Sequence, residues 1–344
     1  MNSARRAFVT GATGFIGTRL VQMLLEQGWA VRALARRVEQ PALCGLGEGP
    51  WRHQNVEIFC GDITETDSLQ RGIAGCSHVF HLAAYAKNWA PDPHTFHVMN
   101  VEGMRNVFEA AAGANVERVV WTSTCVTLGP SPPGAVVDEA SPRRSERFFT
   151  EYEETKTIAE REAIERAGKG FPVVIVNPTR VFGPGKRTEG NSVSRLIDEY
   201  DRGKMPFLLN RGRNIGNWAF VDDVVRGHIL AMERGHIGER YLLGGENATL
   251  NEFLAIIDSV SGKRHIQIPM LKYTPLLFAW MQKKRAQWLG MYPDITPGWV
   301  ETFATDWAFS CRKAEQELGY TITPLREALR VTCEWLLRVR EEEK

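Results

Sequence analysis

The sequence predicts an α/β fold in which a doubly wound parallel sheet is joined to a smaller, mostly helical C-terminal region. Over about the first half of the chain, short runs rich in β-branched residues alternate with longer helical patterns, as strands do when crossover helices join them. A glycine-rich turn at residues 11–17 follows the first of these runs. After Asn177-Pro178 the alternation loosens into a Gly-Pro-Gly loop and a polar stretch, which indicates a second region.

Each element follows from the local period of apolar residues and from its interruptions. Six strands are expected at residues 7–10, 31–35, 56–59, 79–82, 119–123 and 173–176. Helices are expected at 15–27, after 67, from about 100, at 152–167 and at 193–202. Segment 219–234 predicts a short strand, an acidic helix start and a helix, so the chain is expected to return to the sheet. We therefore assign residues 1–178 plus 216–245 to the sheet domain and 179–215 plus 246–344 to a second, substrate-binding region.

Composition excludes several classes of partner. The 344 residues are 43% hydrophobic and 24% charged with a net charge of +1, so no overall field attracts nucleic acid. No apolar run reaches the length of a membrane span, and the first strand leaves no room for a signal peptide. The six cysteines form no C-x-x-C pair and no zinc-like group with histidines. We expect a cytoplasmic protein with reduced thiols and no metal site.

The string T-G-A-T-G-F-I-G lies between the first expected strand and an amphipathic helix, which is the context of a dinucleotide-binding loop. Glycines at 11, 14 and 17 leave a turn without side chains, so a pyrophosphate can approach backbone amides at a helix N-terminus. The expected loop residues are Gly11, Gly14, Phe15, Ile16 and Gly17, with the amides of Phe15 and Ile16 as donors. The alternative is a tight strand-to-helix turn that binds nothing.

The end of the second strand favours NADP over NAD. An acid at this place usually holds the ribose hydroxyls in NAD enzymes, but here Arg36 and Arg37 follow the strand. A guanidinium suits a 2'-phosphate, although two solvated arginines are the alternative and NAD stays open. The turn Gly61-Asp62-Ile63 after the third strand predicts an adenine contact in which Asp62 accepts from the exocyclic amine. A simple strand-end turn is the competing interpretation.

A tyrosine and a lysine lie four residues apart in the helical pattern Y-E-E-T-K. Tyr152 and Lys156 therefore project from one helix face. The ammonium would lower the pKa of the phenol and reach the nicotinamide ribose, which makes Tyr152 a usable general acid or base. Thr124, at the end of an expected strand, is placed to hold a substrate oxygen beside the phenol. The alternative is an ordinary surface helix.

Together the motifs resemble the extended short-chain dehydrogenases/reductases of the NAD-dependent epimerase/dehydratase superfamily over essentially the whole chain. The strings are T-G-A-T-G-F-I-G, G-D-I-T, V-F-H-L-A-A, N-V-E-G-M-R-N-V, W-T-S-T-C-V-T-L-G, Y-E-E-T-K, N-P-T-R-V-F-G-P-G, F-V-D-D-V and E-L-G-Y. The resemblance implies a Rossmann-type sheet, with Thr124 as the catalytic hydroxyl (Ser123 being a neighbouring candidate), Tyr152 as the acid/base and Lys156 as its partner. It also implies cofactor contacts by Leu82, Ala83, Ala84, Thr122 and Pro178, a structural Asn100, and a homodimer through the helices near Asn100 and Tyr152.

Local strings distinguish branches of this family. Nucleotide-sugar members usually carry Arg-Asp just before an F-x-x-V-D-D type segment, where this chain reads Gly216-Asn217-Trp218-Ala219-Phe220-Val221-Asp222-Asp223. Their absence disfavours a nucleotide sugar, although Arg180, Arg187, Arg211 or Arg213 could substitute. The strings W-A-P-D, which begins at Trp89, and I-G-E-R-Y-L-L-G-G-E-N resemble hopanoid-associated epimerase-like proteins and the dihydroflavonol-reductase and 3β-hydroxysteroid-dehydrogenase relatives. Trp89 is therefore expected at the substrate.

The C-terminal part is rich in aromatic residues, which favour a large apolar ligand. They are Tyr273, Phe278, Trp280, Trp288, Trp299 and Trp307. An aromatic core is the alternative, and a third interpretation is peripheral membrane contact, because cations are interleaved with apolar residues at 277–288.

The sequence thus predicts an NADP(H)-dependent oxidoreductase that interconverts a carbonyl and a secondary alcohol on an apolar small molecule, steroid-, terpenoid- or flavonoid-like. The enzyme alternative is a nucleotide-sugar epimerase or dehydratase with tightly bound NAD. Cys125 and Val126 stand where dehydratases place acids, which disfavours that version. A non-catalytic dinucleotide sensor is the second alternative, and the Tyr152/Lys156 pair disfavours it.

Overall fold

The centre of the protein is a seven-stranded parallel sheet. A computed structural model describes residues 5–36, 50–145, 147–186, 191–270 and 273–343. The strand order is β10-β6-β5-β4-β1-β2-β3, and every pairing in this sheet is parallel. The strands are β1 (Arg6–Thr10), β2 (Ala30–Ala35), β3 (Val56–Cys60), β4 (His78–His81), β5 (Arg118–Thr122), β6 (Val173–Pro178) and β10 (Arg240–Leu243). This order confirms the doubly wound fold.

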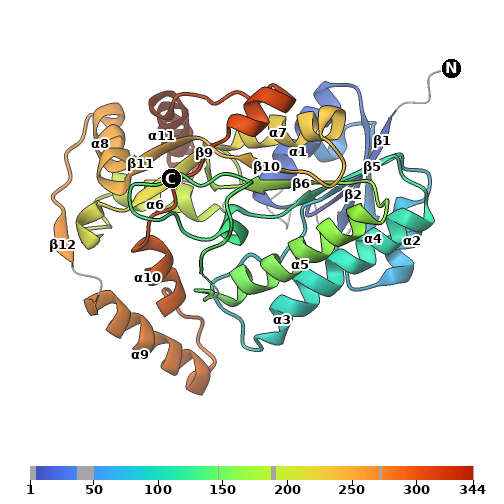
Figure 1. The fold of residues 1–344 in the computed structure, drawn as a ribbon. Coiled ribbons are helices and arrows are strands. Elements are labelled where there is room, and N and C mark those ends of the chain that lie inside the picture. The colour runs from blue at the N-terminus through green and yellow to red at the C-terminus, as the bar shows by residue number, and fades with distance from the viewer. Residues whose placement is uncertain (1–4, 37–49, 146, 187–190, 271–272, 344) are drawn as a thin grey trace.

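Helices cover both faces of the sheet (Figure 1). Helices α1 (Phe15–Glu26) and α7 (Val221–Arg234) pack on one face, and α2 (Thr66–Ile73), α4 (Gly103–Gly113) and α5 (Glu151–Gly168) on the other. Side chains alternate between the faces, so Ala7 and Val9 join the first apolar cluster while Phe8 joins the second. The strand order reverses between β1 and β4, so the loops after these two strands open a crevice at the carboxyl edge.

A second region is built around a three-stranded sheet with the order β11-β9-β7. Its strands are β7 (Arg180–Phe182), β9 (Ile215–Phe220) and β11 (Glu246–Thr249). Helices α6 (Ser192–Asp201), α8 (Leu250–Ser261) and α11 (Leu325–Glu342) enclose it. In this third apolar cluster Trp218 stacks on Phe253 with ring centroids 4.0 Å apart. A two-stranded pair, β8 (Phe207–Leu209) and β12 (Ile268–Met270), lies beside it.

Two expectations about segment 216–245 differ from the structure. The strand expected to return to the main sheet is β9, and it pairs with β7 and β11 instead. β7 begins two residues after β6 ends, so its partner β9 is drawn away from the main sheet. The seventh strand of that sheet is β10, which the sequence did not predict, because four residues are too few to show a period.

The helix expected from Asn100 begins earlier, at α3 (His94–His97), and passes through a π-helical turn (Val98–Glu102) into α4.

Helix α9 (Tyr273–Leu289) lies apart from both sheets, and α10 (Pro297–Phe303) lies between it and the second region (Figure 1). The buried residues of α9 are Ala279, Gln282 and Ala286, so only a narrow stripe of this helix is covered. In the described part of the chain, no helix combines the length and apolar character needed to cross a membrane. Five cysteines in that part are free thiols, and no group of three metal-ligating side chains occurs there.

Candidate active site

A cavity of about 740 Å³ runs along the carboxyl edge of the main sheet and into the second region. This size is typical of a small-molecule or cofactor site. Most of the predicted site residues line it: Gly11, Gly14, Phe15, Ile16, Gly17, Arg36, Asp62, Ile63, Leu82, Ala83, Ala84, Thr122, Ser123, Thr124, Tyr152 and Pro178. Arg37 and Arg187 lie outside the described residues. Lys156 and Trp89 are absent from the described lining.

The glycine loop has the shape that a dinucleotide requires. Gly11 has a φ of +67°, and a Cβ there would lie 2.7 Å from the amide nitrogen of Ala83 after β4. A Cβ on Gly17 would lie 2.1 Å from the carbonyl oxygen of Gly11. Side chains at either position would therefore force the loop away from the sheet. The first turn of α1 contains no acidic residue and Gly14 provides no side-chain cap, so the helix terminus can accept an anion.

Polar contacts between β1 and β4 fix the floor of this loop. The side-chain oxygen of Thr10 lies 2.7 Å from Nδ1 of His81 and accepts a 3.1 Å hydrogen bond from the amide of Ala83. Burial, together with a smaller effect of the nearby Lys156 ammonium, lowers the pKa of His81 to about 3. The imidazole is therefore neutral and serves as a hydrogen-bonding link between the two strands at the crevice.

Tyr152 and Thr124 both line the cavity. Thr124 ends the segment after β5 and its side chain caps the short turn Cys125–Leu128 by accepting from the Val126 amide at 3.5 Å. Burial raises the pKa of Tyr152 to about 12, while a hydrogen bond with Thr124 opposes this shift. The sequence-based expectation that Lys156 lowers this pKa is therefore not met, because burial dominates. The phenol is protonated at neutral pH.

Lys156 lies behind the cavity wall. Its Nζ donates a 2.8 Å hydrogen bond to the Thr122 carbonyl and lies 4.2 Å from the centre of the Trp121 ring. The side chain is 1% exposed, and burial lowers the pKa of its ammonium to about 7, with Glu160 raising it in part. Lys156 thus supports the strand end that holds Thr122 and Thr124.

A buried polar network underlies the same strand ends. Glu160 accepts hydrogen bonds from Thr127 at 3.0 Å, Asn177 at 2.6 Å and Arg240 at 2.9 Å. Asn177 also donates to the Thr124 carbonyl at 3.0 Å. These contacts connect α5, β6 and β10 to the turn after Thr124, so they fix the position of the Thr124 hydroxyl.

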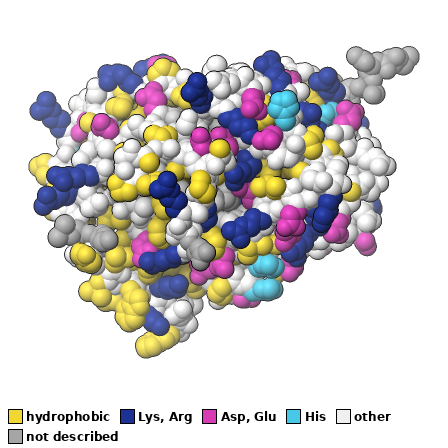
Figure 2. Space-filling view, viewed as in Figure 1, with side chains coloured by type: hydrophobic (Ala, Val, Ile, Leu, Met, Phe, Trp, Pro, Cys, Tyr) yellow, Lys and Arg dark blue, Asp and Glu magenta, His cyan; other side chains and the backbone are white. Residues whose placement is uncertain are grey.

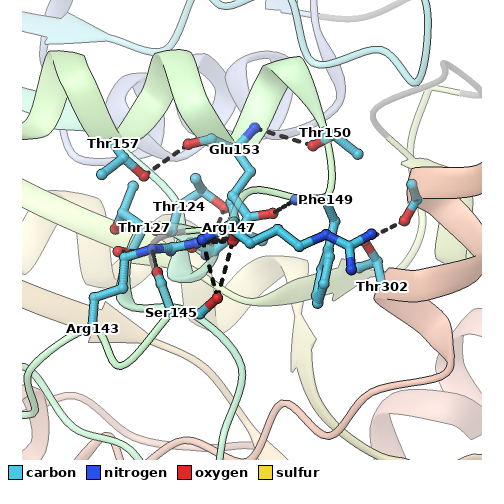
Figure 3. Close-up of polar contacts among 12 residues, drawn as sticks. Thr124, Thr127, Arg143, Ser145, Arg147, Phe149, Thr150, Glu153, Thr157 and Thr302 are labelled. Atoms are coloured by element: carbon cyan, nitrogen blue, oxygen red, sulfur yellow. Dashed lines mark hydrogen bonds and ion pairs between the residues drawn. The ribbon is translucent and has the colours of Figure 1, made fainter.

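A second set of contacts ties the same turn to the start of α5 (Figure 3). The Arg143 guanidinium donates to the carbonyls of Val126 at 2.7 Å and Thr127 at 3.2 Å, and it pairs with the buried carboxylate of Glu153. Glu153 also accepts from the amide of Phe149 at 2.8 Å. Arg143 and Glu153 therefore couple the Thr124 turn to the residue beside Tyr152, a pair that the sequence analysis did not identify.

Asn100 has contacts consistent with the structural role that the family resemblance implies. Its side-chain oxygen accepts from the Tyr85 amide at 2.7 Å, and its nitrogen donates to Thr155 at 3.1 Å. It therefore joins the segment after β4 to α5. Trp89 lines a smaller neighbouring pocket of about 200 Å³ and packs edge-on against Tyr292 with ring centroids 5.6 Å apart.

The far end of the cavity is aromatic, and the sequence predicts only part of it. Of the C-terminal aromatic residues expected around a substrate, Trp307 lines the cavity, whereas Tyr273, Phe278, Trp280 and Trp288 are exposed on α9. Phe303 and Phe309 also line it, as does Arg180, the first residue of β7. Arg211 and Arg213 are not part of the described lining. No sequence period marks this wall, because its residues come from β7 and from the segment around α10.

Comparisons with known proteins agree with this geometry. The sequence model of the NAD dependent epimerase/dehydratase family matches residues 7–244. A Synechocystis protein provisionally named dihydroflavonol 4-reductase is 34% identical, with 95% of this chain and 93% of that protein covered. Sterol demethylase protein B of Methylococcus capsulatus is 35% identical, with 74% of each chain covered. The sterol-4-alpha-carboxylate 3-dehydrogenase, decarboxylating, of Mus musculus is 26% identical, with 99% and 94% covered.

Solved structures show the same fold. The crystal structure of gox2253 is 31% identical and superposes with a TM-score of 0.81, covering 97% of this chain and 98% of its own. The UDP-glucuronic acid 4-epimerase of Bacillus cereus, in complex with NAD, superposes with a TM-score of 0.76 at 23% identity, covering 97% and 99% of the two chains. The chain therefore belongs to the NAD dependent epimerase/dehydratase family and is an NAD(P)-dependent oxidoreductase of the extended short-chain dehydrogenase/reductase type.

Proposed function

We propose that the protein transfers a hydride between NADP(H) and a carbonyl or secondary alcohol on an apolar small molecule, steroid-, terpenoid- or flavonoid-like. The observation that best supports this is that the Tyr152 phenol and Thr124 line one cavity, which continues from the glycine loop to an aromatic wall. The names of the relatives, a dihydroflavonol reductase and sterol enzymes, support the same substrate class.

The residues fit a reduction in which the cofactor, when bound, supplies the hydride. The glycine loop would hold the pyrophosphate and Arg36 a 2'-phosphate. Thr124 orients the substrate oxygen, and Tyr152 donates its proton to that oxygen as negative charge develops there. A phenol with a pKa of about 12 is a suitable donor to an alkoxide and stays protonated until charge appears. Lys156 holds the strand end through the Thr122 carbonyl.

The test compares NADPH and NADH oxidation by wild type, Tyr152→Phe and Arg36→Ala with ketosteroids, terpenoid ketones and aromatic ketones. Tyr152→Phe is expected to lower kcat by at least about 100-fold, and Arg36→Ala to raise KM for NADPH but not for NADH. The exposed residues Tyr273 and Arg52 provide matched controls as Tyr273→Phe and Arg52→Ala. An unchanged rate in Tyr152→Phe would contradict the assignment.

The same experiment separates the alternatives. An absence of net turnover, with NAD retained through purification, would indicate a nucleotide-sugar epimerase. Cofactor binding without turnover of any substrate would indicate a dinucleotide sensor. Asn217, in the segment where nucleotide-sugar members carry Arg-Asp, accepts from Thr179 at 2.8 Å and donates to the Gly245 carbonyl at 2.8 Å. This side chain is occupied in joining strands, which favours the reductase.

A further inference from the structure

Arg180 places a cation at the aromatic end of the cavity. Its guanidinium lies 5.2 Å from the centre of the Trp218 ring and 4.6 Å from that of Phe303. A Cβ on Gly216 would lie 2.7 Å from Nη1 of Arg180, so the glycine leaves room for the guanidinium. The aromatic rings and this glycine hold the cation at the cavity wall, at a residue that also lines the open volume.

Protein groups satisfy this guanidinium only in part. In the described part of the chain its one hydrogen bond runs from Nη2 to the Thr302 carbonyl at 3.3 Å, and no carboxylate lies within ion-pair distance. The Thr302 carbonyl already accepts a 2.7 Å bond from Trp307. Asp306 interacts with Arg180 only as a more distant charge and is engaged by the Asn214 side chain and the Ile215 amide. Burial lowers the pKa of Arg180 to about 10, so the group is charged at neutral pH.

Arg180 is half-buried and has no carboxylate within ion-pair distance in the described part of the chain, which is unfavourable for a charged group. Its five donors form a planar fork that matches a carboxylate. We propose that Arg180 binds a carboxylate carried by the substrate. This inference rests on the proposed function and narrows its substrate class to apolar ketones or alcohols that bear an acid group. Phe303, Trp307 and Phe309, which line the cavity, would enclose the apolar body next to that group.

A single carboxylate fits better than a diphosphate. The other cations in the described lining are Arg36, Lys87 and Lys186. Arg36 follows β2, and Lys186 donates to the Thr13 carbonyl of the glycine loop at 3.2 Å. Lys87 lies 5.6 Å and 5.7 Å from the ring centres of Tyr85 and Tyr292. Lys186 thus lies at the glycine loop and Arg36 at the end of β2. Among the described lining residues, the aromatic wall of Phe303, Trp307 and Phe309 has Arg180 as its cation.

The experiment uses carboxylate and carboxamide pairs, which have the same shape and differ in charge. The probes are 4-acetylbenzoate, 6-acetyl-2-naphthoate and 3-oxocholanoate, each with its amide, added to the protein saturated with NADP⁺. Tryptophan fluorescence gives Kd, because Trp218 lies under the guanidinium. Wild type is expected to bind at least one carboxylate about 10-fold or more tightly than its amide.

The variants identify the source of that preference. Arg180→Gln is expected to abolish it and Arg180→Lys to retain part of it, while Arg195→Gln, which removes an exposed arginine of α6, leaves it intact. Equal binding of every pair in wild type, or a preference that persists in Arg180→Gln, would overturn the inference. A lower melting temperature in Arg180→Gln with an unchanged carboxylate-to-amide ratio would show a purely structural brace and would also overturn it.

Two further arms separate this inference from the proposed function. A carboxylate preference that depends on Arg180, without turnover by NADPH, would support the inference and contradict the reductase. Turnover of neutral ketones with equal binding of acids and amides would support the reductase and contradict the inference. Binding of UDP that depends on Arg180, without a carboxylate preference, would overturn the inference in favour of a nucleotide-sugar ligand.

Discussion

At the scale of one residue, the buried ammonium of Lys156 makes the free energy of unfolding depend on pH. Its pKa in the folded protein is about 7, against an ordinary value of 10.5, because burial disfavours the charged form. Between these pH values the unfolded chain binds more protons at this position than the folded one, so the free energy of unfolding rises with pH. Below pH 7 the ammonium is charged in both states, and the cost of burying it is fully present.

Urea unfolding of wild type and Lys156→Met at pH 7 and pH 9.5 tests this sign. The free energy of unfolding of wild type, minus that of the variant, is expected to increase with pH. Lys284→Met removes an exposed lysine from α9, where burial cannot generate this pH dependence, and is the matched control. An equal change in the free energy of unfolding of wild type and Lys156→Met between pH 7 and pH 9.5 would contradict the burial of the Lys156 ammonium.

The individual site residues differ in how far the sequence could predict them. The glycine loop and the pair Tyr152/Thr124 were identifiable because local strings and the strand-end rule specify them, and the structure brings them to one cavity. The depth of Lys156 was not predictable, since the spacing Y-x-x-x-K fixes a helix face and not what covers it. Arg180 was only one of four candidate arginines, because its aromatic neighbours, Trp218 and Phe303, are far away in sequence.

At the scale of elements, the turn after β5 and the start of α5 are coupled by Arg143. Its guanidinium is 10% exposed and the partner carboxylate of Glu153 is 3% exposed. Removing one partner of a buried pair leaves the other charge unpaired, which costs about 3–5 kcal/mol. Arg143→Met is therefore expected to lower the free energy of unfolding by roughly that amount. It should also lower kcat more than it changes KM for NADPH, because Thr124 is held by the same turn.

Arg147→Met is the matched control for this coupling. Arg147, labelled in Figure 3, pairs with Glu301 at 2.8 Å. Its side chain is 70% exposed, so its loss is expected to cost less than about 1 kcal/mol. Denaturant unfolding and steady-state kinetics measure both effects. A stable Arg143→Met protein with unchanged kcat would show that the turn and α5 are positioned independently.

Elements with a long, regular period were predicted within a few residues, as α1, α5 and α6 show. The exceptions have a common cause, which is that tertiary pairing decides the identity of a short strand. The run G-N-W-A-F, which forms most of β9, is buried on both sides. Its apolar pattern therefore does not predict whether β9 pairs with β6 or with β7. β10 has only four residues, and its pairing with β6 in the folded structure is what identifies it as a strand.

At the scale of the whole molecule, apolar side chains gather on one projecting part, the surface of α9 (Figures 1 and 2). Trp288 is 83% exposed and Leu277 is 62% exposed, and an exposed apolar surface of this kind marks an interaction site. Lys284 lies 5.6 Å from the centre of the Trp280 ring, so cations are interleaved with the aromatic residues. This combination suits an anionic lipid surface, from which an apolar substrate could enter the adjacent region.

Sedimentation with vesicles of phosphatidylcholine and phosphatidylglycerol measures this contact. Wild type is expected to bind the anionic vesicles, and the double variant Trp280→Ser/Trp288→Ser to bind at least about 10-fold more weakly, because each large side chain contributes about 1.5–3 kcal/mol when buried. Ile237→Ser removes an exposed apolar side chain from the segment between α7 and β10 and is the control. Light scattering is run in parallel, because a homodimer is expected through α4 and α5. Conversion of the double variant from dimer to monomer, without vesicle binding by wild type, would instead show that α9 joins two copies of the chain.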